Sequence, residues 1–129
     1  MAIKAPTGTN RNQGSIALNA FFKIGELWHL TNGEQMILLG LNNESTFYKW
    51  KNHPETARLD PDKIERISYL LGIYKDLQSL LGSKATANAW VRQPNTAPLF
   101  GGRSALDLML QGKVADLFLV RQYLHSQKA

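Results

Sequence analysis

The 129-residue chain has no cysteine, and it has no apolar run of the roughly 18 residues that a membrane-spanning helix needs. The absence of cysteine excludes disulfides, thiolate metal sites and cysteine nucleophiles. The polar amino end, residues 1–15, lacks the apolar segment of a signal peptide. These absences predict a cytoplasmic protein that makes no contact with a membrane.

Catalytic and metal-binding patterns are missing as well. The three histidines, His29, His53 and His125, are scattered without a second ligand at metal spacing, so we expect no metal site. The sequence contains no Gly-x-Ser-x-Gly, phosphate-binding glycine loop or His-Glu-x-x-His pattern. We therefore expect no enzymatic activity and no cofactor, because an enzyme would need a site assembled from scattered residues.

The hydrophobic content, 43%, suits a packed globule, and the net charge of +5 is unevenly placed. Residues 1–60 carry six basic and five acidic residues, a net charge of +1. Residues 61–129 carry nine basic and five acidic residues, a net charge of +4. A mildly basic chain suits nucleic-acid binding or plain solubility, and composition leaves both open.

Hydrophobic periodicity predicts an all-α protein. Residues 1–15 are polar and contain glycine and proline, which predicts a flexible arm. Apolar residues then recur at helical spacing from Ile16 to Trp28. Thr31 and Glu34 fit a capping box that opens a short helix, and Gly40 is suited to end it in the left-handed conformation.

Further helices are expected downstream. Ser45 is a candidate N-cap for a helix that His53-Pro54 ends. Asp60, followed by proline, should begin a long helix with a broad apolar surface. Shorter helices are expected over residues 84–91, 104–110 and 114–126. The predicted organisation is an arm (1–15) and two helical domains (16–82 and 83–129).

The two short helices on either side of Gly40 form a helix-turn-helix pattern. In that motif the second helix enters the major groove of DNA and its flanks contact phosphates. The candidate base-reading residues are Ser45, Thr46, Tyr48 and Lys49, and the candidate backbone contacts are Lys51, Asn52 and Arg58. Glu44 and Glu55 oppose phosphate contact, so an ordinary helical corner with a solvated face is an equal alternative.

The stretch NAWVRQPNTAPLFGGR, from Asn88 to Arg103, combines two prolines and two glycines in a non-regular segment. Prolines restrict the backbone and glycines reach conformations closed to other residues. The following helix start, with Arg103 beside it, favours anions. By residues alone, a rigid turn that lets helices pack is favoured over a binding loop.

Several residues of this region nevertheless resemble the Xre/MbcA/ParS-type toxin-binding domain of antitoxins. The similarity rests on Trp90-x-Arg92-x-Pro94-Asn95, Phe100-Gly-Gly-Arg-Ser104, Leu106, Met109, Gly112 and Val120-Arg-x-Tyr-Leu124, and it spans roughly residues 83–129. The upstream half resembles the Xre-like helix-turn-helix that precedes this domain. The spacing between Asn95 and Gly101 is longer here than in many members.

The resemblance implies an antitoxin of a type II toxin–antitoxin pair. Its partners would be a cognate toxin, typically a RES-domain protein that consumes NAD, and operator DNA, with the antitoxin a homodimer inside a toxin–antitoxin hetero-oligomer. The toxin-binding residues that the resemblance implies are Trp90, Arg92, Asn95, Gly101, Gly102 and Arg103. The alternative is a helix-turn-helix regulator of transcription that has no toxin partner.

Overall fold

The computed structural model describes residues 4–128, and this part of the chain is helical, with one isolated β-bridge and no strand. The all-α prediction is confirmed. In chain order, the helices are α1 (Lys4–Leu27), α2 (Asn32–Leu39), α3 (Glu44–Asn52), the 3-10 turn η1 (Pro54–Thr56), α4 (Pro61–Leu80), α5 (Lys84–Ala89), the 3-10 turn η2 (Trp90–Arg92), α6 (Ala105–Met109) and α7 (Val114–Gln127).

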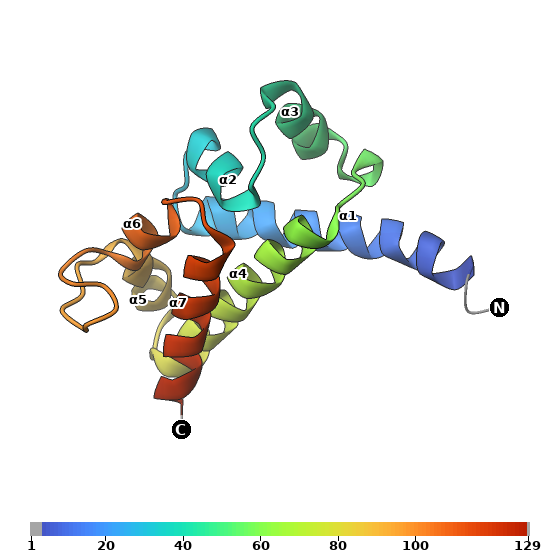
Figure 1. The fold of residues 1–129 in the computed structure, drawn as a ribbon. Coiled ribbons are helices and arrows are strands. Elements are labelled where there is room, and N and C mark those ends of the chain that lie inside the picture. The colour runs from blue at the N-terminus through green and yellow to red at the C-terminus, as the bar shows by residue number, and fades with distance from the viewer. Residues whose placement is uncertain (1–3, 129) are drawn as a thin grey trace.

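The chain forms two groups of helices, and the long helices α1 and α4 lie where the groups meet (Figure 1). Helices α2 and α3 lie on one side of α1, while α5 and α7 pack along α4, and α6 packs against η2 and α7. Helix α4 packs against both α1 and α7, so it belongs to both groups. Its apolar faces explain this: Ile67, Leu70, Ile73 and Leu77 are all buried.

One hydrophobic core runs through both groups. Its largest fully buried side chains include Trp28, Phe47 and Phe100, which come from the turn after α1, from α3 and from the loop after η2. The proposed division at residue 82 therefore separates two sequence domains that share a continuous core. A change to a core residue in either domain is expected to lower the stability of the whole chain, because both domains contribute side chains to this core.

The structure differs from the prediction at the amino end. Residues 4–15 were expected to form a flexible arm, but α1 continues back to Lys4; residues 1–3 lie outside the described part. Adding a residue to an existing helix gains one hydrogen bond without the cost of nucleation, so a polar segment can extend an apolar helix. Gly14 is buried, and a Cβ atom placed on it would lie 3.6 Å from the Leu59 side chain.

The helix boundaries otherwise follow the predicted caps closely. The capping box at Thr31 and Glu34 is present, Gly40 is left-handed at φ 69°, and Asp60 caps α4. The cap of α3 was predicted wrongly: the N-cap is Asn43 instead of Ser45. The Asn43 side chain accepts from the Thr46 amide at 2.9 Å, and this leaves Ser45 inside the first turn.

Candidate DNA- and partner-binding surfaces

Helices α2 and α3 and the turn between them have the geometry of a helix-turn-helix. The turn occupies residues 40–43, between the left-handed Gly40 and the Asn43 cap. Phe47 and Trp50 of α3 are buried in the shared core, and Phe47 contacts Phe22 of α1. The edge-to-face contact of Phe47 with Phe22, with ring centroids 6.0 Å apart, fixes the orientation of α3 on the core.

The opposite side of α3 is exposed, and it carries four of the predicted residues. Ser45, Tyr48, Lys49 and Asn52 follow one another at intervals of three, one and three positions, and all four are exposed. This spacing places them on one helix face. Their hydroxyl, ammonium and amide groups can donate to and accept from base edges. Thr46 is half-buried and its backbone is bound by the Asn43 cap.

Tyr48 and Lys51 are tied to the first residue of α2. The Tyr48 hydroxyl accepts from the Asn32 side-chain amide nitrogen at 3.2 Å, and the Lys51 ammonium donates to the Asn32 side-chain oxygen Oδ1 at 2.9 Å. Lys51 also lies 5.6 Å from the centre of the Phe47 ring. Lys51 of α3 is therefore linked to α2 by its hydrogen bond to the Asn32 side chain. Arg58 is exposed in the segment between η1 and α4.

Backbone hydrogen bonds close the loop after η2 on itself. The Asn95 amide donates to the Arg103 carbonyl at 3.1 Å, the Gly102 amide donates to the Asn95 carbonyl at 2.8 Å, and the Ala97 amide donates to the Asn95 side chain at 2.9 Å. Gly101 and Gly102 have φ of 58° and 91°. A Cβ atom on either glycine would meet nothing within 4 Å, so both glycines serve the backbone conformation.

A row of aromatic rings anchors this loop to α7. Phe100 is fully buried between Trp90 and Tyr123, with ring centroids 5.8 and 5.1 Å away. Trp90 and Tyr123 are half-buried and line a cavity of about 290 Å³ with Leu77, Leu80, Leu81, Leu124 and Gln127. This slot offers an apolar surface beside the loop, of a kind that an apolar side chain of a partner protein would fit.

The two loop arginines differ in their contacts. Arg103 is exposed, and its Nε donates to the Phe100 carbonyl over a long 3.5 Å. Arg92 instead donates to the Trp28 carbonyl at 3.0 Å, to the His29 carbonyl at 2.7 Å and to the Glu34 carboxylate at 3.3 Å. Arg92, one of the residues that the family resemblance implies for toxin binding, makes these contacts within the chain while 42% of its side chain stays exposed.

A buried ion cluster that the sequence analysis did not single out joins α4 to α7. The Asp76 side chain is 3% exposed, and it accepts from Arg121 in a short contact and from Lys128 at 3.1 Å. A Cβ atom on Gly72 would lie 2.0 Å from Arg121, so this glycine makes room for the guanidinium. The sequence feature that could have indicated this cluster is Asp76 itself, a charged residue between Ile73 and Leu77 on an apolar helix face that is buried in the structure.

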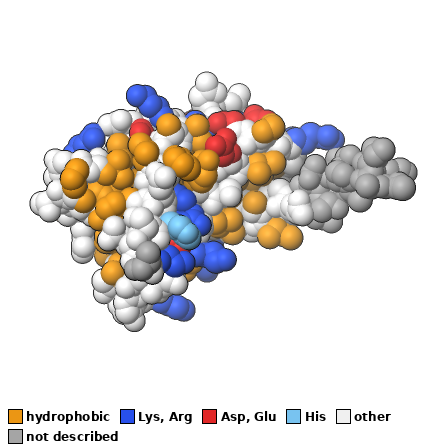
Figure 2. Space-filling view, turned by 60° about the horizontal axis from the view of Figure 1, so that its bottom comes forward, with side chains coloured by type: hydrophobic (Ala, Val, Ile, Leu, Met, Phe, Trp, Pro, Cys, Tyr) orange, Lys and Arg blue, Asp and Glu red, His pale blue; other side chains and the backbone are white. Residues whose placement is uncertain are grey.

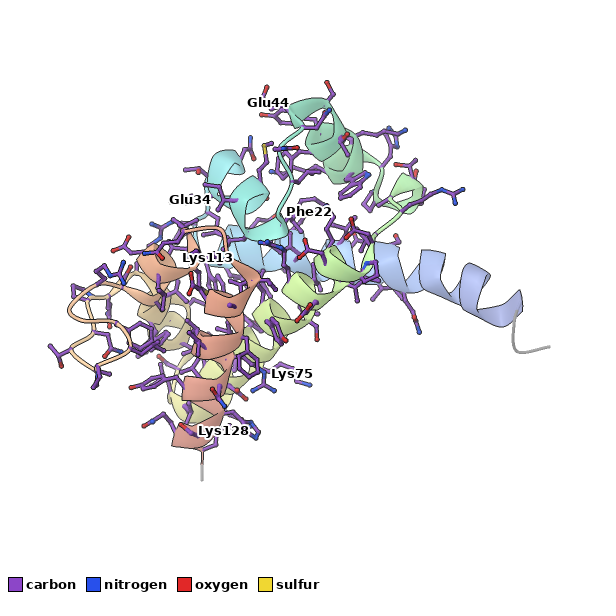
Figure 3. All side chains as sticks on the ribbon, viewed as in Figure 1. Phe22, Glu34, Glu44, Lys75, Lys113 and Lys128 are labelled. Atoms are coloured by element: carbon purple, nitrogen blue, oxygen red, sulfur yellow. The ribbon has the colours of Figure 1, made fainter. Side chains whose placement is uncertain are left out.

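The outer end of the molecule, where α7 finishes, carries a mixed surface. Figure 2 shows Lys, Arg and His side chains gathered beside hydrophobic patches on this face. In Figure 3 Lys75 and Lys128 lie at this end, while Glu44 lies on α3 at the opposite end. Lys75 and Lys128 are thus separated from the exposed face of α3.

The described side chains assemble no metal centre. No group of three or more His, Asp or Glu that could hold a metal is found among them.

The Lys63 amide donates to the Asp60 carboxylate and lowers its pKa, while the hydrogen bond to Glu65 raises the pKa of Tyr69. Both shifts have local causes at a helix cap and a helix face. Within the described residues, no helix is long and apolar enough to cross a membrane.

Comparison with known families assigns both halves of the chain. Residues 11–72 match the antitoxin Xre-like helix-turn-helix domain, and residues 76–128 match the antitoxin Xre/MbcA/ParS C-terminal toxin-binding domain. The chain belongs to the Xre/MbcA/ParS antitoxin family. This antitoxin is also 46% identical over 111 residues to the uncharacterized protein y4oB of Sinorhizobium fredii, a match that covers 86% of this chain and 83% of that protein.

The antitoxin is therefore of type II, with a DNA-binding and a toxin-binding domain. Both matched families are binding modules, in agreement with the expectation that the chain is not an enzyme. The matched regions meet within α4, at residues 73–75, whereas the sequence analysis placed the division at residues 82 and 83.

Proposed function

We propose that the antitoxin neutralises a RES-domain, NAD-consuming toxin by covering the toxin's active site, and that it represses its own operon as a homodimer. The observation that carries this proposal is the placement of two binding surfaces on different elements. The exposed stripe of α3 has the hydrogen-bonding groups of a DNA reader, and the braced loop after η2 ends on an exposed arginine.

The DNA-binding residues that we propose are Ser45, Thr46, Tyr48, Lys49, Lys51, Asn52 and Arg58. Among them, Lys49 is the cation of the exposed stripe, and Lys51 and Arg58 flank it. These few cations can neutralise only a few phosphates. Each neutralised phosphate adds about 0.9 to the salt slope, the steepness with which the logarithm of the binding constant falls with the logarithm of the salt concentration. We therefore expect a shallow dependence of promoter binding on salt, with two half-sites related by the dimer axis.

The toxin-binding surface that we propose consists of the loop and the aromatic slot beside it, with Trp90, Arg92, Asn95, Gly101, Gly102 and Arg103 as the residues implied by the family. Their contacts divide them into two roles. Asn95 and both glycines shape the loop, Arg92 holds it to α1 and α2, and Trp90 and Arg103 are left to meet the toxin.

Two single substitutions test the proposal. Lys49→Ala should weaken binding to the promoter duplex and reduce its salt slope by about 1, with neutralisation unchanged. Arg103→Ala should lower the affinity for the toxin encoded in the adjacent reading frame about thirtyfold or more, the effect of losing a charge-assisted contact at an interface.

NAD consumption by the co-expressed toxin and the promoter Kd report on the two duties separately. If the adjacent gene encodes no toxin and NAD levels never change, the RES assignment is wrong and a toxin-free regulator is favoured. If the wild-type protein does not bind its own upstream region, autorepression is wrong.

A further inference from the structure

An arginine from outside the motif lies at each end of the first helix of the helix-turn-helix. At its amino end, Arg92 of the toxin-binding loop reaches Glu34, which also accepts from the Thr31 amide in the capping box at 2.9 Å. The same guanidinium donates to the carbonyls of Trp28 and His29, which close α1. One side chain thus joins the end of α1, the start of α2 and the loop.

At its carboxyl end, α2 rests on Arg66 of α4. A Cβ atom on the left-handed Gly40 would lie 2.7 Å from the Arg66 Nε, which shows how closely this arginine approaches the turn. Arg66 donates to Asp62 at 2.9 Å and to the carbonyl of Gly112, between α6 and α7, at 3.1 Å. Its side chain is 11% exposed.

The chemistry of these contacts favours a fixed position for α2. Carbonyls at the end of a helix carry partial negative charge, and a cation placed there is stabilised by the helix dipole. A guanidinium has several donors in a rigid plane, so Arg92 can bind three acceptors at once while losing little rotational freedom per bond. Alanine at position 92 would make none of these hydrogen bonds. Lysine there would keep the charge, but its single ammonium group on a flexible stem cannot bind all three acceptors at once.

We propose that Arg92 is a positioning residue for DNA binding, although it lies in the loop of the toxin-binding domain. It sets the orientation of α2, and Asn32 of α2 in turn holds Tyr48 and Lys51 of α3. This inference rests on the proposed binding of α3 to the promoter.

The test compares Arg92→Ala with Arg103→Ala, a loop arginine of the same charge that makes no contact with α1 or α2 in the described structure. The probe is a duplex of the region immediately upstream of the gene. We expect Arg92→Ala to weaken binding to this duplex about fivefold or more, the lower range of typical coupling between sites. Arg103→Ala should leave this binding unchanged, and Arg92→Lys should recover part of the loss.

Hydrogen exchange gives a readout that does not depend on DNA. Arg92→Ala should speed exchange of the α2 and α3 amides while the amides of α4 and α7 stay protected; Arg103→Ala should do neither. If the wild-type protein binds the duplex and Arg92→Ala binds equally tightly, the inference is overturned. If the wild-type protein does not bind the duplex, promoter binding itself is wrong. Unchanged exchange in α2 then rejects the positioning role separately.

Discussion

Removing Arg121 tests how strongly the buried ion cluster joins the two domains. Asp76 is almost fully buried, and Arg121 and Lys128 are its two cationic partners. Deleting one member of a buried pair typically costs about 3–5 kcal/mol, because a charge is left without compensation. Lys128 remains beside Asp76 after Arg121→Ala, and the Arg121 side chain is 32% exposed, so we expect the lower end, about 3 kcal/mol of unfolding free energy.

Urea and thermal unfolding followed by far-ultraviolet circular dichroism measure this loss. For a chain of this size, 3 kcal/mol corresponds to a decrease in Tm of about 12 °C. The double variant Asp76→Leu, Arg121→Ala should be less destabilised than the sum of its single variants, since it leaves no unpaired buried carboxylate. An Arg121→Ala variant that unfolds within about 0.5 kcal/mol of the wild type, the range of ordinary surface changes, would contradict this reasoning.

Three further predictions concern single positions. His29→Gly should raise the unfolding free energy by about 0.5–1 kcal/mol, because His29 has φ 57° and glycine adopts this conformation freely; no gain in urea unfolding would count against it. Gly102→Val should cost about 1–3 kcal/mol in the same assay, since Gly102 has φ 91°, and an unchanged Tm would show that the loop relaxes. The pKa of Asp60 is lowered by the Lys63 amide, so its cap stabilises the fold above the carboxyl's unfolded pKa and is lost as the pH falls through the lower folded value. Asp60→Asn should remove this loss of unfolding free energy at low pH. Identical dependence of unfolding free energy on pH in the two proteins would refute the prediction.

The amino-acid sequence by itself determined the helical segments, most of their ends and the family. Helix caps are local: Thr31 with Glu34 and Ser104 with Asp107 form their capping boxes within four consecutive residues, so their pattern can be read directly. The amino end was the exception, because polar residues continue α1 to Lys4 where their composition suggested an arm. Asn43 was missed as a cap because Ser45 offered an equally suitable side chain two positions later.

Tertiary structure decided which members of the signature loop are free. Arg92 and Arg103 look alike in sequence, yet the Arg92 side chain bonds to residues 58 to 64 positions away, whereas among the described residues the Arg103 side chain bonds to Phe100, three positions away. Asp76 likewise finds its cations 45 and 52 positions downstream. Pairing over such separations depends on how α1, α4 and α7 pack, and periodicity along a single helix carries no information about it. The assignment of each arginine to structure or to binding therefore requires the folded chain.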